Sequence, residues 1–309
     1  MIESMDTLWT AAYDIYHKSP VMVGVVWPDS EIMLQAIKDT QGRIANFTII
    51  GDGNKMKAIG ESIISPDLDV TIVGTQKTPR EAADYAMGWV VEDGGLDLVM
   101  KGSIETKLFL QAALNKDREY NLRTDRLFSH VAVLEIPEYA KLLLISDAGV
   151  CIKPTLKQKI DIVQNAIDVA HKLGIDYPTV AVLAANEKVN PDMPESLDAA
   201  ALTVMESTGQ LKDAYIVGPM SFDCAISVQV RDTKGVEWMY DDADILVVPD
   251  VVSGNMLAKS IIHFAGGKMA GVVMGAKVPL IVASRAGSVD EQVHSIALGV
   301  LLTGDKLDG

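Results

Sequence analysis

Residues 245–260, ILVVPDVVSGNMLAKS, and residues 271–293, GVVMGAKVPLIVASRAGSVDEQV, contain the pattern that decides the fold. Each stretch holds a short apolar run typical of a buried strand, 245–248 in the first and 278–283 in the second. Each run ends in glycine and polar residues, which are typical of the loop before a helix. Open α/β sheets bind ligands at the carboxyl ends of their strands. The sequence therefore predicts that both strand ends contribute to a ligand site.

Strand and helix signals alternate along the rest of the chain. Further strands are predicted at residues 21–27, 47–50, 70–73, 96–100, 179–184 and 215–217. Helices are predicted at residues 31–39, from about 55, at 79–91, from 104 through 114, and at 156–173, 196–208, 223–230, 256–263 and 291–302. A hairpin is predicted from strands 130–136 and 141–145. This alternation predicts an α/β fold in which helices cover both faces of mostly parallel sheets.

Length and composition agree with two ordinary domains. The chain has 309 residues, of which 49% are hydrophobic and 22% charged. We place the boundary near the end of the polar stretch 115–129. The predicted first domain combines residues 1–129 with 290–309, so that the last helix closes it, and the second domain spans 130–289.

Charge and cysteine usage exclude several classes of function. The net charge is −15, which argues against nucleic acid and against anionic membranes as partners. Two cysteines form no disulfide framework, and residues 1–19 indicate an amphipathic helix rather than a signal peptide, so we expect a cytoplasmic protein. The five histidines lack the spacing of metal ligands, so no metal site is expected.

Ser284 and Arg285 directly follow the predicted strand 278–283. A guanidinium binds phosphate through two parallel N–H donors, and a serine hydroxyl can hydrogen-bond a reacting carbonyl oxygen. The alternative is an exposed arginine in a surface turn. Glu291, seven residues after Ser284, can act as a general base. It also fits a capping box with Ser288, and the sequence leaves both roles open.

Two loops are candidate anion sites. Gly254 and Asn255 precede a predicted helix, where backbone N–H groups attract anions. Taken alone, this pattern fits a loop in which Asn255 caps the helix better than an anion site. Lys101, Gly102 and Ser103 also stand between a strand and a helix, but they lack the spacing of a P-loop.

Five stretches, in consistent order, resemble the phosphate acetyl/butyryltransferase family. They are MKGSIETKLFLQAAL (100–114), NEKVNPDMPESLDAA (186–200), the weaker GPMSFDCAIS (218–227), VPDVVSGNMLAKS (248–260) and GVVMGAKVPLIVASRAGS (271–288). The segments SHVAVLEIP (129–137) and KVNP (188–191) resemble the butyryl and branched-chain branch more than the acetyl branch.

The resemblance implies two three-layer α/β/α domains with a cleft between them, a plan shared with isocitrate and isopropylmalate dehydrogenases, and a homodimer. It implies the reaction acyl-CoA plus phosphate giving acyl phosphate plus CoA, by direct transfer in a ternary complex, with no permanently bound cofactor. Carried over, Arg285 binds phosphate, Ser284 contacts the thioester, and Glu291 stands where the acetyl branch has an aspartate base. Lys259 and Gly275, within matching stretches, join Lys101–Ser103, Gly254 and Asn255 as candidate phosphate or CoA ligands.

Other functions stay open at this point. A phosphate acetyltransferase is the nearest alternative. The acetyl branch has an arginine where this chain has Gln111, which leaves room for a CoA- or acyl-phosphate-binding protein without catalysis. A metal- and nicotinamide-dependent dehydrogenase requires clustered aspartates at strand ends and a dinucleotide loop, and neither pattern is found in the sequence.

Overall fold

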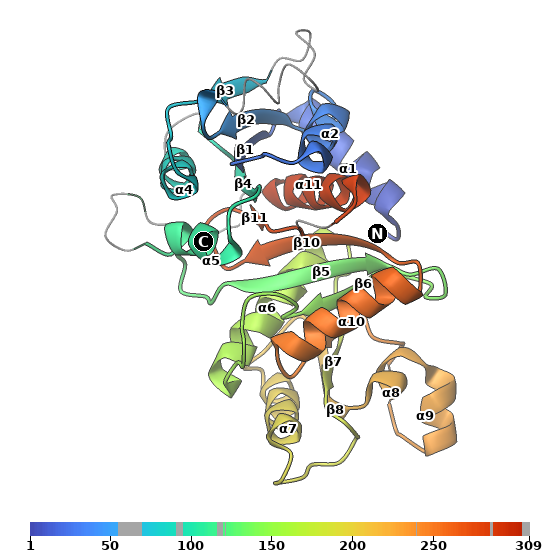
Figure 1. Cartoon of the computed structure of the whole chain (residues 1–309). Helices are drawn as coiled ribbons and strands as arrows, with labels where there is room; N and C mark the ends of the chain where they lie inside the picture. The colour runs from blue at the N-terminus through green and yellow to red at the C-terminus, as the bar shows by residue number, and fades with distance from the viewer. Residues whose placement is uncertain are drawn as a thin grey trace. The chain divides into compact units, whose positions relative to one another are not determined.

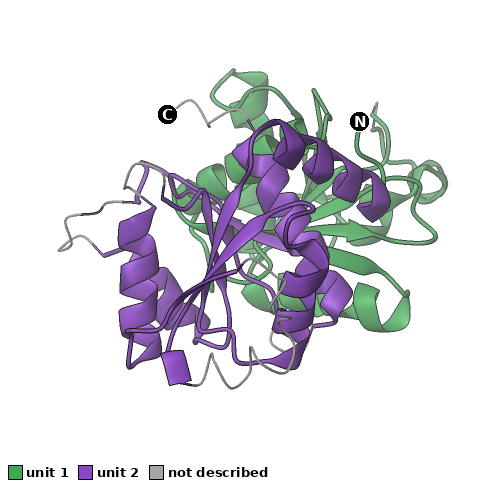
Figure 2. Ribbon diagram, turned by 90° about the horizontal axis from the view of Figure 1, so that it is seen from above, with its two compact units in different colours: residues 1–4, 127–269 green, residues 5–126, 270–309 purple. Residues whose placement is uncertain are grey.

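The chain forms two compact units in a computed structural model that describes residues 1–54, 70–90, 95–115, 120, 122–238, 240–284 and 287–304. Unit 1 comprises Met1–Ser4 and Leu127–Met269, and unit 2 comprises Met5–Arg126 and Ala270–Gly309 (Figure 2). Residues 270–289, which we expected in the second domain, cluster with the N-terminal part of the chain. The predicted division into folding domains otherwise stays a prediction.

Unit 2 is built on a mostly parallel sheet in the order β3-β2-β1-β4-β11-β10 (Figure 1). The neighbouring pairs from β3 to β11 are parallel, and β10 runs antiparallel to β11. The strands are β1 (Met22–Val26), β2 (Asn46–Ile50), β3 (Thr71–Val73), β4 (Leu98–Lys101), β10 (Lys268–Met274) and β11 (Leu280–Ile281). The central strands β1 and β4 are almost entirely buried, as a sheet covered on both faces requires.

Helices cover both faces of this sheet. The helices are α1 (Met5–Lys18), α2 (Glu31–Thr40), α4 (Pro79–Trp89), α5 (Thr106–Ala113) and α11 (Val289–Thr303). Helix α11 packs on β4 and β11 and contacts α1 and α2, whereas α4 packs on β1 and β2 beside α5 (Figure 1). Thr78 caps α4 and Pro79 occupies its first turn, as predicted from their preferences for these positions.

The strands of unit 1 lie in the order β5-β6-β9-β7-β8. The strands are β5 (Ser129–Glu135), β6 (Leu143–Ser146), β7 (Thr179–Leu183), β8 (Tyr215–Met220) and β9 (Ile245–Val247). β5 and β6 form the predicted antiparallel hairpin, and the pairs β6–β9, β9–β7 and β7–β8 are parallel. The α/β class with mostly parallel sheets is therefore confirmed.

The helices of unit 1 are α6 (Leu156–Lys172), α7 (Pro194–Ser207), α8 (Phe222–Ile226), α9 (Val228–Lys234) and α10 (Val251–Phe264). Helix α6 packs on β5, β6 and β9, and α7 packs on β7 and β8, while α10 and α8 contact β6 and β7 (Figure 1). Among the described residues, no helix combines the length and apolar character needed to cross a bilayer.

Several predicted elements differ from the structure. The predicted helix 223–230 is two helices, because Ser227 leaves the helical conformation and caps α9. Helix α10 begins at Val251 rather than 256. Strand β10 was not predicted, and β11 is shorter than the predicted 278–283. The helix predicted from residue 55 lies outside the described residues.

Candidate functional site

Three loops meet at the carboxyl edge of the unit 2 sheet, because β1, β4 and β11 are parallel neighbours. They are residues 27–30 after β1, 101–103 at the end of β4, and 283–284 after β11. Nine residues from these loops and adjacent helices line a small pocket: Ser30, Ile32, Met33, Lys101, Gly102, Ser103, Ala283, Ser284 and Gln292. The structure thus brings four predicted site residues, Lys101, Gly102, Ser103 and Ser284, to one place.

The loop after β4 is held by backbone bonds to the end of β1. The amide of Gly102 donates to the Val26 carbonyl at 2.8 Å, and the amide of Ser103 donates to the Trp27 carbonyl at 2.9 Å. A Cβ on Gly102 would lie 2.5 Å from both carbonyl oxygens, so only glycine fits. These two amides therefore join β4 to β1, and any anion here must bind to other donors.

Lys101 is a buried cation beside this pocket, with 3% of its surface exposed. Its Nζ donates to the carbonyl of Gly102 at 3.1 Å and of Ile104 at 3.4 Å. A buried ammonium needs such acceptors to compensate for lost hydration. Helix α2 starts at the same pocket and adds the positive end of its dipole. Lys101 and this helix start thus bring positive charge to the site in a strongly acidic protein.

Ser284 and the first turn of α11 are linked by two hydrogen bonds. The Ser284 amide donates to Glu291 Oε1 at 3.1 Å, and the Ser284 carbonyl accepts from Gln292 Nε2 at 3.0 Å. Glu291 is 8% exposed and Gln292 3% exposed. The Glu291 carboxylate is thereby held beside the backbone that leads into Arg285.

The geometry distinguishes the two roles considered for Glu291, which are a general base and the partner of Ser288 in a capping box. Ser288 caps α11, and its Oγ accepts the amide of Glu291 at 3.1 Å. The carboxylate of Glu291 accepts from Ser284, and its other oxygen lies 2.5 Å from the position of a Cβ on Gly287. Glu291 thus belongs to a capped turn while its carboxylate is directed to the loop of Ser284 and Gly287.

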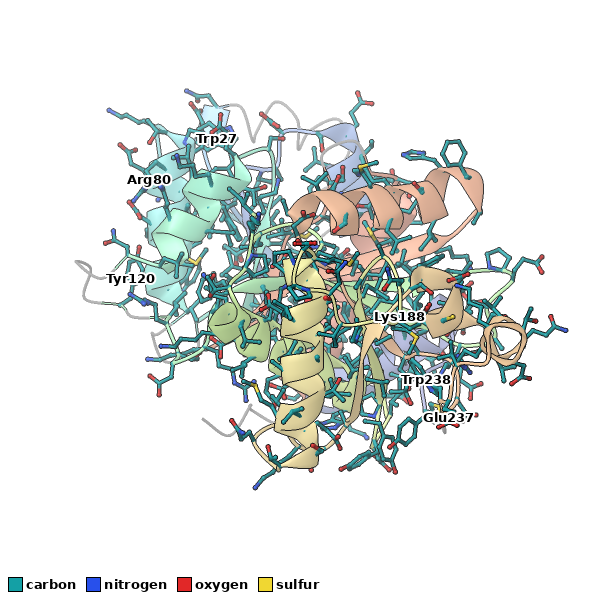
Figure 3. All side chains as sticks on the ribbon, turned by 90° about the horizontal axis from the view of Figure 1, so that it is seen from below. Trp27, Arg80, Tyr120, Lys188, Glu237 and Trp238 are labelled. Carbon is teal, nitrogen blue, oxygen red and sulfur yellow. The ribbon has the colours of Figure 1, made fainter. Side chains whose placement is uncertain are left out.

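Arg285, the predicted phosphate ligand, lies outside the described residues. Arg80, which we did not single out as a site residue, follows β3 in the first turn of α4. Its Nε lies 3.3 Å from Asp84 Oδ2, and its side chain is 40% exposed. Figure 3 labels Arg80 and Trp27, both of unit 2. Arg80 is thus a cation, like Lys77, among the residues that follow β3, and it is not part of the pocket lining.

Three other predicted residues lie in unit 1, on α10. Asp250 caps this helix and accepts the Ser253 amide at 2.8 Å; that hydrogen bond lowers the pKa of Asp250. A carboxylate thus occupies the helix start where we expected amides free for an anion. Gly254 lies inside the helix, and a Cβ there would come within 2.5 Å of the Asp147 carbonyl, so it permits close packing.

Asn255 and Lys259 follow on the same helix, and both are exposed. Asn255 Nδ2 donates to the Ala148 carbonyl at 3.4 Å, so Asn255 is not the helix cap considered from the sequence. Gly275 has a φ of +96° and accepts from Thr124 Oγ1 at 2.6 Å. Gly275 directly follows β10, which is antiparallel to β11, so it lies at the sheet edge opposite Ser284.

A polar cluster not singled out from the sequence lies at the carboxyl ends of β7 and β8. The Ser221 hydroxyl bonds the carboxylates of Glu187 and Asp223, and Lys234 Nζ lies 2.8 Å from Asp223 Oδ2. The hydrogen bond from Lys234 is the main reason that the pKa of Asp223 falls to about 2. The sequence signal for this cluster lies in the family-like stretches, since 186–200 follows β7 and 218–227 includes the end of β8 and the residues after it.

Glu187, Asp223 and Cys224 are close enough to one another to share a metal ion. However, Lys234 already supplies a positive charge to both carboxylates, 2.8 Å from Asp223 and 3.6 Å from Glu187. The Lys234 ammonium thus supplies the positive charge that a metal ion would supply to these carboxylates. The donor set therefore gives no reason to place a metal in this cluster.

Comparison with known proteins gives a consistent result. The family model described as phosphate acetyl/butaryl transferase matches residues 68–300. A phosphate butyryltransferase of Clostridium acetobutylicum is 37% identical over 92% of this chain and 94% of that protein. A phosphate acetyltransferase of Rickettsia felis is 39% identical over 90% of this chain and 80% of that protein.

Solved structures agree with this result. A branched-chain phosphotransacylase from Enterococcus faecalis V583 superimposes with a TM-score of 0.79 at 29% identity, covering 92% of this chain and 99% of that one. The family model spans most of the chain, and the relatives match it nearly end to end. The chain belongs to the phosphate acetyl/butaryl transferase family.

Proposed function

We propose that this chain transfers a short acyl group, butyryl or branched-chain, between coenzyme A and inorganic phosphate, so that acyl-CoA and phosphate give acyl phosphate and CoA. The enzyme class follows from the family, which makes the chain a phosphate acyltransferase. The observation that carries the proposal is the grouping of Lys101, Ser284 and the turn of Glu291 at one sheet edge.

The reaction needs groups of the kind found there. A phosphate oxygen attacks the thioester carbonyl carbon, the C–S bond breaks, and the proton of hydrogen phosphate ends on the CoA sulfur. In the reverse direction a base must remove the thiol proton, whose pKa resembles that of cysteine. We assign this proton transfer to Glu291. The Ser284 hydroxyl is assigned to the carbonyl oxygen, where negative charge develops.

Arg285 and Lys101 are the proposed phosphate ligands, and Gly102 and Ser103 complete the loop that holds Lys101. The net charge of −15 disfavours anions in general, so local cations must select phosphate. Holding phosphate beside the thioester replaces a bimolecular encounter, which supplies much of the rate. Gly254, Asn255, Lys259 and Gly275 remain proposed CoA or phosphate contacts; the packing of Gly254 and the placement of Gly275 favour structural roles for those two.

The choice of acyl group rests on the relatives. The butyryltransferase of Clostridium acetobutylicum matches 94% of its own length, and the solved branched-chain phosphotransacylase matches 99%. The acetyltransferase of Rickettsia felis matches 80%. The phosphate butyryltransferase and the branched-chain phosphotransacylase are the basis for proposing a butyryl or branched-chain group.

The test is release of CoA thiol from acetyl-, propionyl-, butyryl-, isobutyryl- and isovaleryl-CoA, with and without phosphate. We expect phosphate-dependent release with the largest kcat/KM for a four- or five-carbon acyl group. A largest value for acetyl-CoA would assign the acetyltransferase function. Tight CoA binding without any phosphate-dependent release would assign a non-catalytic binding protein.

We further propose a cytoplasmic homodimer that needs no permanently bound cofactor or metal. Light scattering on the purified protein measures the oligomer mass. Activity that survives exhaustive dialysis against a chelator supports the absence of a required metal, and loss of activity that returns with an added cation would contradict it.

A further inference from the structure

Gln292 combines burial with an unsatisfied acceptor at the pocket of unit 2. It is 3% exposed and lines the pocket with Lys101, Ser103 and Ser284. Its Nε2 donates to the Ser284 carbonyl at 3.0 Å, whereas its Oε1 has no hydrogen-bond partner among the described residues. Buried amide oxygens without a partner are costly and uncommon in folded proteins. An unpartnered amide oxygen on a side chain that lines this pocket is an acceptor to which a bound ligand can supply a donor.

The other polar groups of this pocket are of the opposite kind. Lys101 brings an ammonium, Ser30 and Ser103 bring hydroxyls, and α2 begins here with its positive dipole end. A set of donors with one carbonyl acceptor fits an oxyanion that still carries a proton. An oxyanion without a proton has no hydrogen to offer Gln292, and its lone pairs would face those of Oε1.

The size of the pocket limits which part of a ligand can reach Gln292. Its free space is about 20 Å³, little more than the room needed for one water molecule. A whole phosphate ion does not fit, but one of its oxygens does. The group that reaches Gln292 is thus a single hydroxyl of a larger anion.

We infer that Gln292 is a specificity-determining residue that accepts the P–OH hydrogen of hydrogen phosphate and so selects phosphate over sulfate. This inference rests on the proposed function, because it assigns the phosphate of that reaction to this pocket. Phosphate and arsenate keep a proton at neutral pH, whereas sulfate has lost both. When sulfate binds, the buried Oε1 of Gln292 stays without a hydrogen-bond donor, and this cost weakens sulfate binding relative to hydrogen phosphate.

Two variants separate this role from support of the Ser284 loop. Gln292→Met removes both amide groups at similar volume, and Gln292→Glu keeps an acceptor but loses the donor to Ser284. Butyryl-CoA is the substrate, phosphate and arsenate are the nucleophiles, and sulfate is the competitive inhibitor. The measured quantity is the sulfate inhibition constant divided by the phosphate KM, with circular dichroism as a check on the fold.

We expect Gln292→Met to lower this ratio about tenfold, the effect of losing one hydrogen bond to a charged ligand. The KM for arsenate should rise with that for phosphate. Gln292→Glu should keep the ratio at or above the wild-type value, since a carboxylate still accepts the hydroxyl of hydrogen phosphate, whereas sulfate has no hydrogen to donate. Equal weakening of phosphate and sulfate in both variants would overturn the inference.

Wild-type protein provides an independent arm if a variant fails to fold. Sulfate should inhibit only at concentrations far above the phosphate KM, while arsenate supports thiol release. Sulfate inhibition at concentrations near the phosphate KM would overturn the inference. Absence of phosphate-dependent turnover in the wild type would instead overturn the proposed function, so the two failures are distinguishable.

Discussion

The Glu291 carboxylate accepts the backbone N–H of Ser284 at 3.1 Å, seven residues back along the chain. This bond links Ser284, which follows β11, to the first turn of α11, and both residues belong to unit 2. It also leaves the second carboxylate oxygen against Gly287. The Glu291 side chain therefore has two roles, the proposed proton transfer and the hydrogen bond that holds Ser284. Variants must be chosen that affect one role and not the other.

Gly287 provides a steric test of the position of that carboxylate. A Cβ at this residue would lie 2.5–2.9 Å from the carboxylate atoms of Glu291. Gly287→Ala should displace the carboxylate and reduce kcat/KM at least tenfold, because small displacements of a catalytic group are costly. Gly88→Ala is the matched control, since its Cβ would meet Tyr120 at an ordinary 3.4 Å inside α4. Unchanged kcat/KM in Gly287→Ala would contradict the assigned role.

Lys101 is predicted to contribute more to phosphate binding than to the stability of the fold. Lys101→Met keeps the apolar stem and removes the buried charge, so the phosphate KM should rise about tenfold or more, as for loss of a charged hydrogen bond. Steady-state kinetics at varied phosphate checks this. Lys107→Met, at an exposed position of α5, is the control and should behave as wild type. A lower Tm with an unchanged phosphate KM would show a purely structural lysine.

Gly254 is predicted to act through packing of α10. A Cβ would meet the Asp147 carbonyl at 2.5 Å and Val248 Cγ2 at 2.8 Å, so Gly254→Ala should destabilise the protein by about 1–3 kcal/mol. Urea unfolding measures this value, and exposed Ser260→Ala on the same helix should stay within about 0.5 kcal/mol of wild type. A raised phosphate or CoA KM without loss of stability would favour the ligand contact instead.

The contact between Asp223 and Lys234 predicts that the Asp223 carboxyl group titrates at an unusually low pH. The pKa of Asp223 is lowered from 3.8 to about 2, chiefly by the hydrogen bond from Lys234 and then by that from Ser221. Because the folded-state pKa is depressed, the stabilisation is present above pH 3.8 and is lost as pH falls through about 2. The carboxyl carbon resonance of Asp223 should therefore hardly shift between pH about 5 and 3, near the usual titration range. Lys234→Met should titrate in that interval, and a wild-type protein that titrates there too would contradict the prediction.

The elements predicted well are those with strong local signals. Thr78-Pro79 starts α4, and the hairpin of β5 and β6 has apolar runs on both sides of a turn. The start of α10 was misplaced because Gly254 disfavours helix, while the cap at Asp250 and contact with residues 147–148 override that preference. Gly271 in the same way interrupts the signal of β10.

The site was predicted only in part for a different reason. Ser284 and Glu291 are close in sequence, and the loop that follows a strand is a general place for ligands. Gln292 becomes informative only through pairing of β4 with β11, strands almost 180 residues apart, which encloses its amide beside Lys101. Burial of a single oxygen depends on such pairing and leaves no local pattern.

The most direct test of the account compares Glu291→Gln with Asp290→Asn. Glutamine retains an acceptor for the Ser284 amide but cannot take a proton, whereas Asp290 is the exposed neighbour in the same helical turn. Thiol release from butyryl-CoA with phosphate should fall about 10²–10⁴-fold in Glu291→Gln, the usual contribution of a general base, with an unchanged Tm. Asp290→Asn should retain wild-type kcat. Equal activity of both variants, or a loss in Glu291→Gln that follows only from a lower Tm, would contradict the assignment of acid–base chemistry to this edge of the sheet.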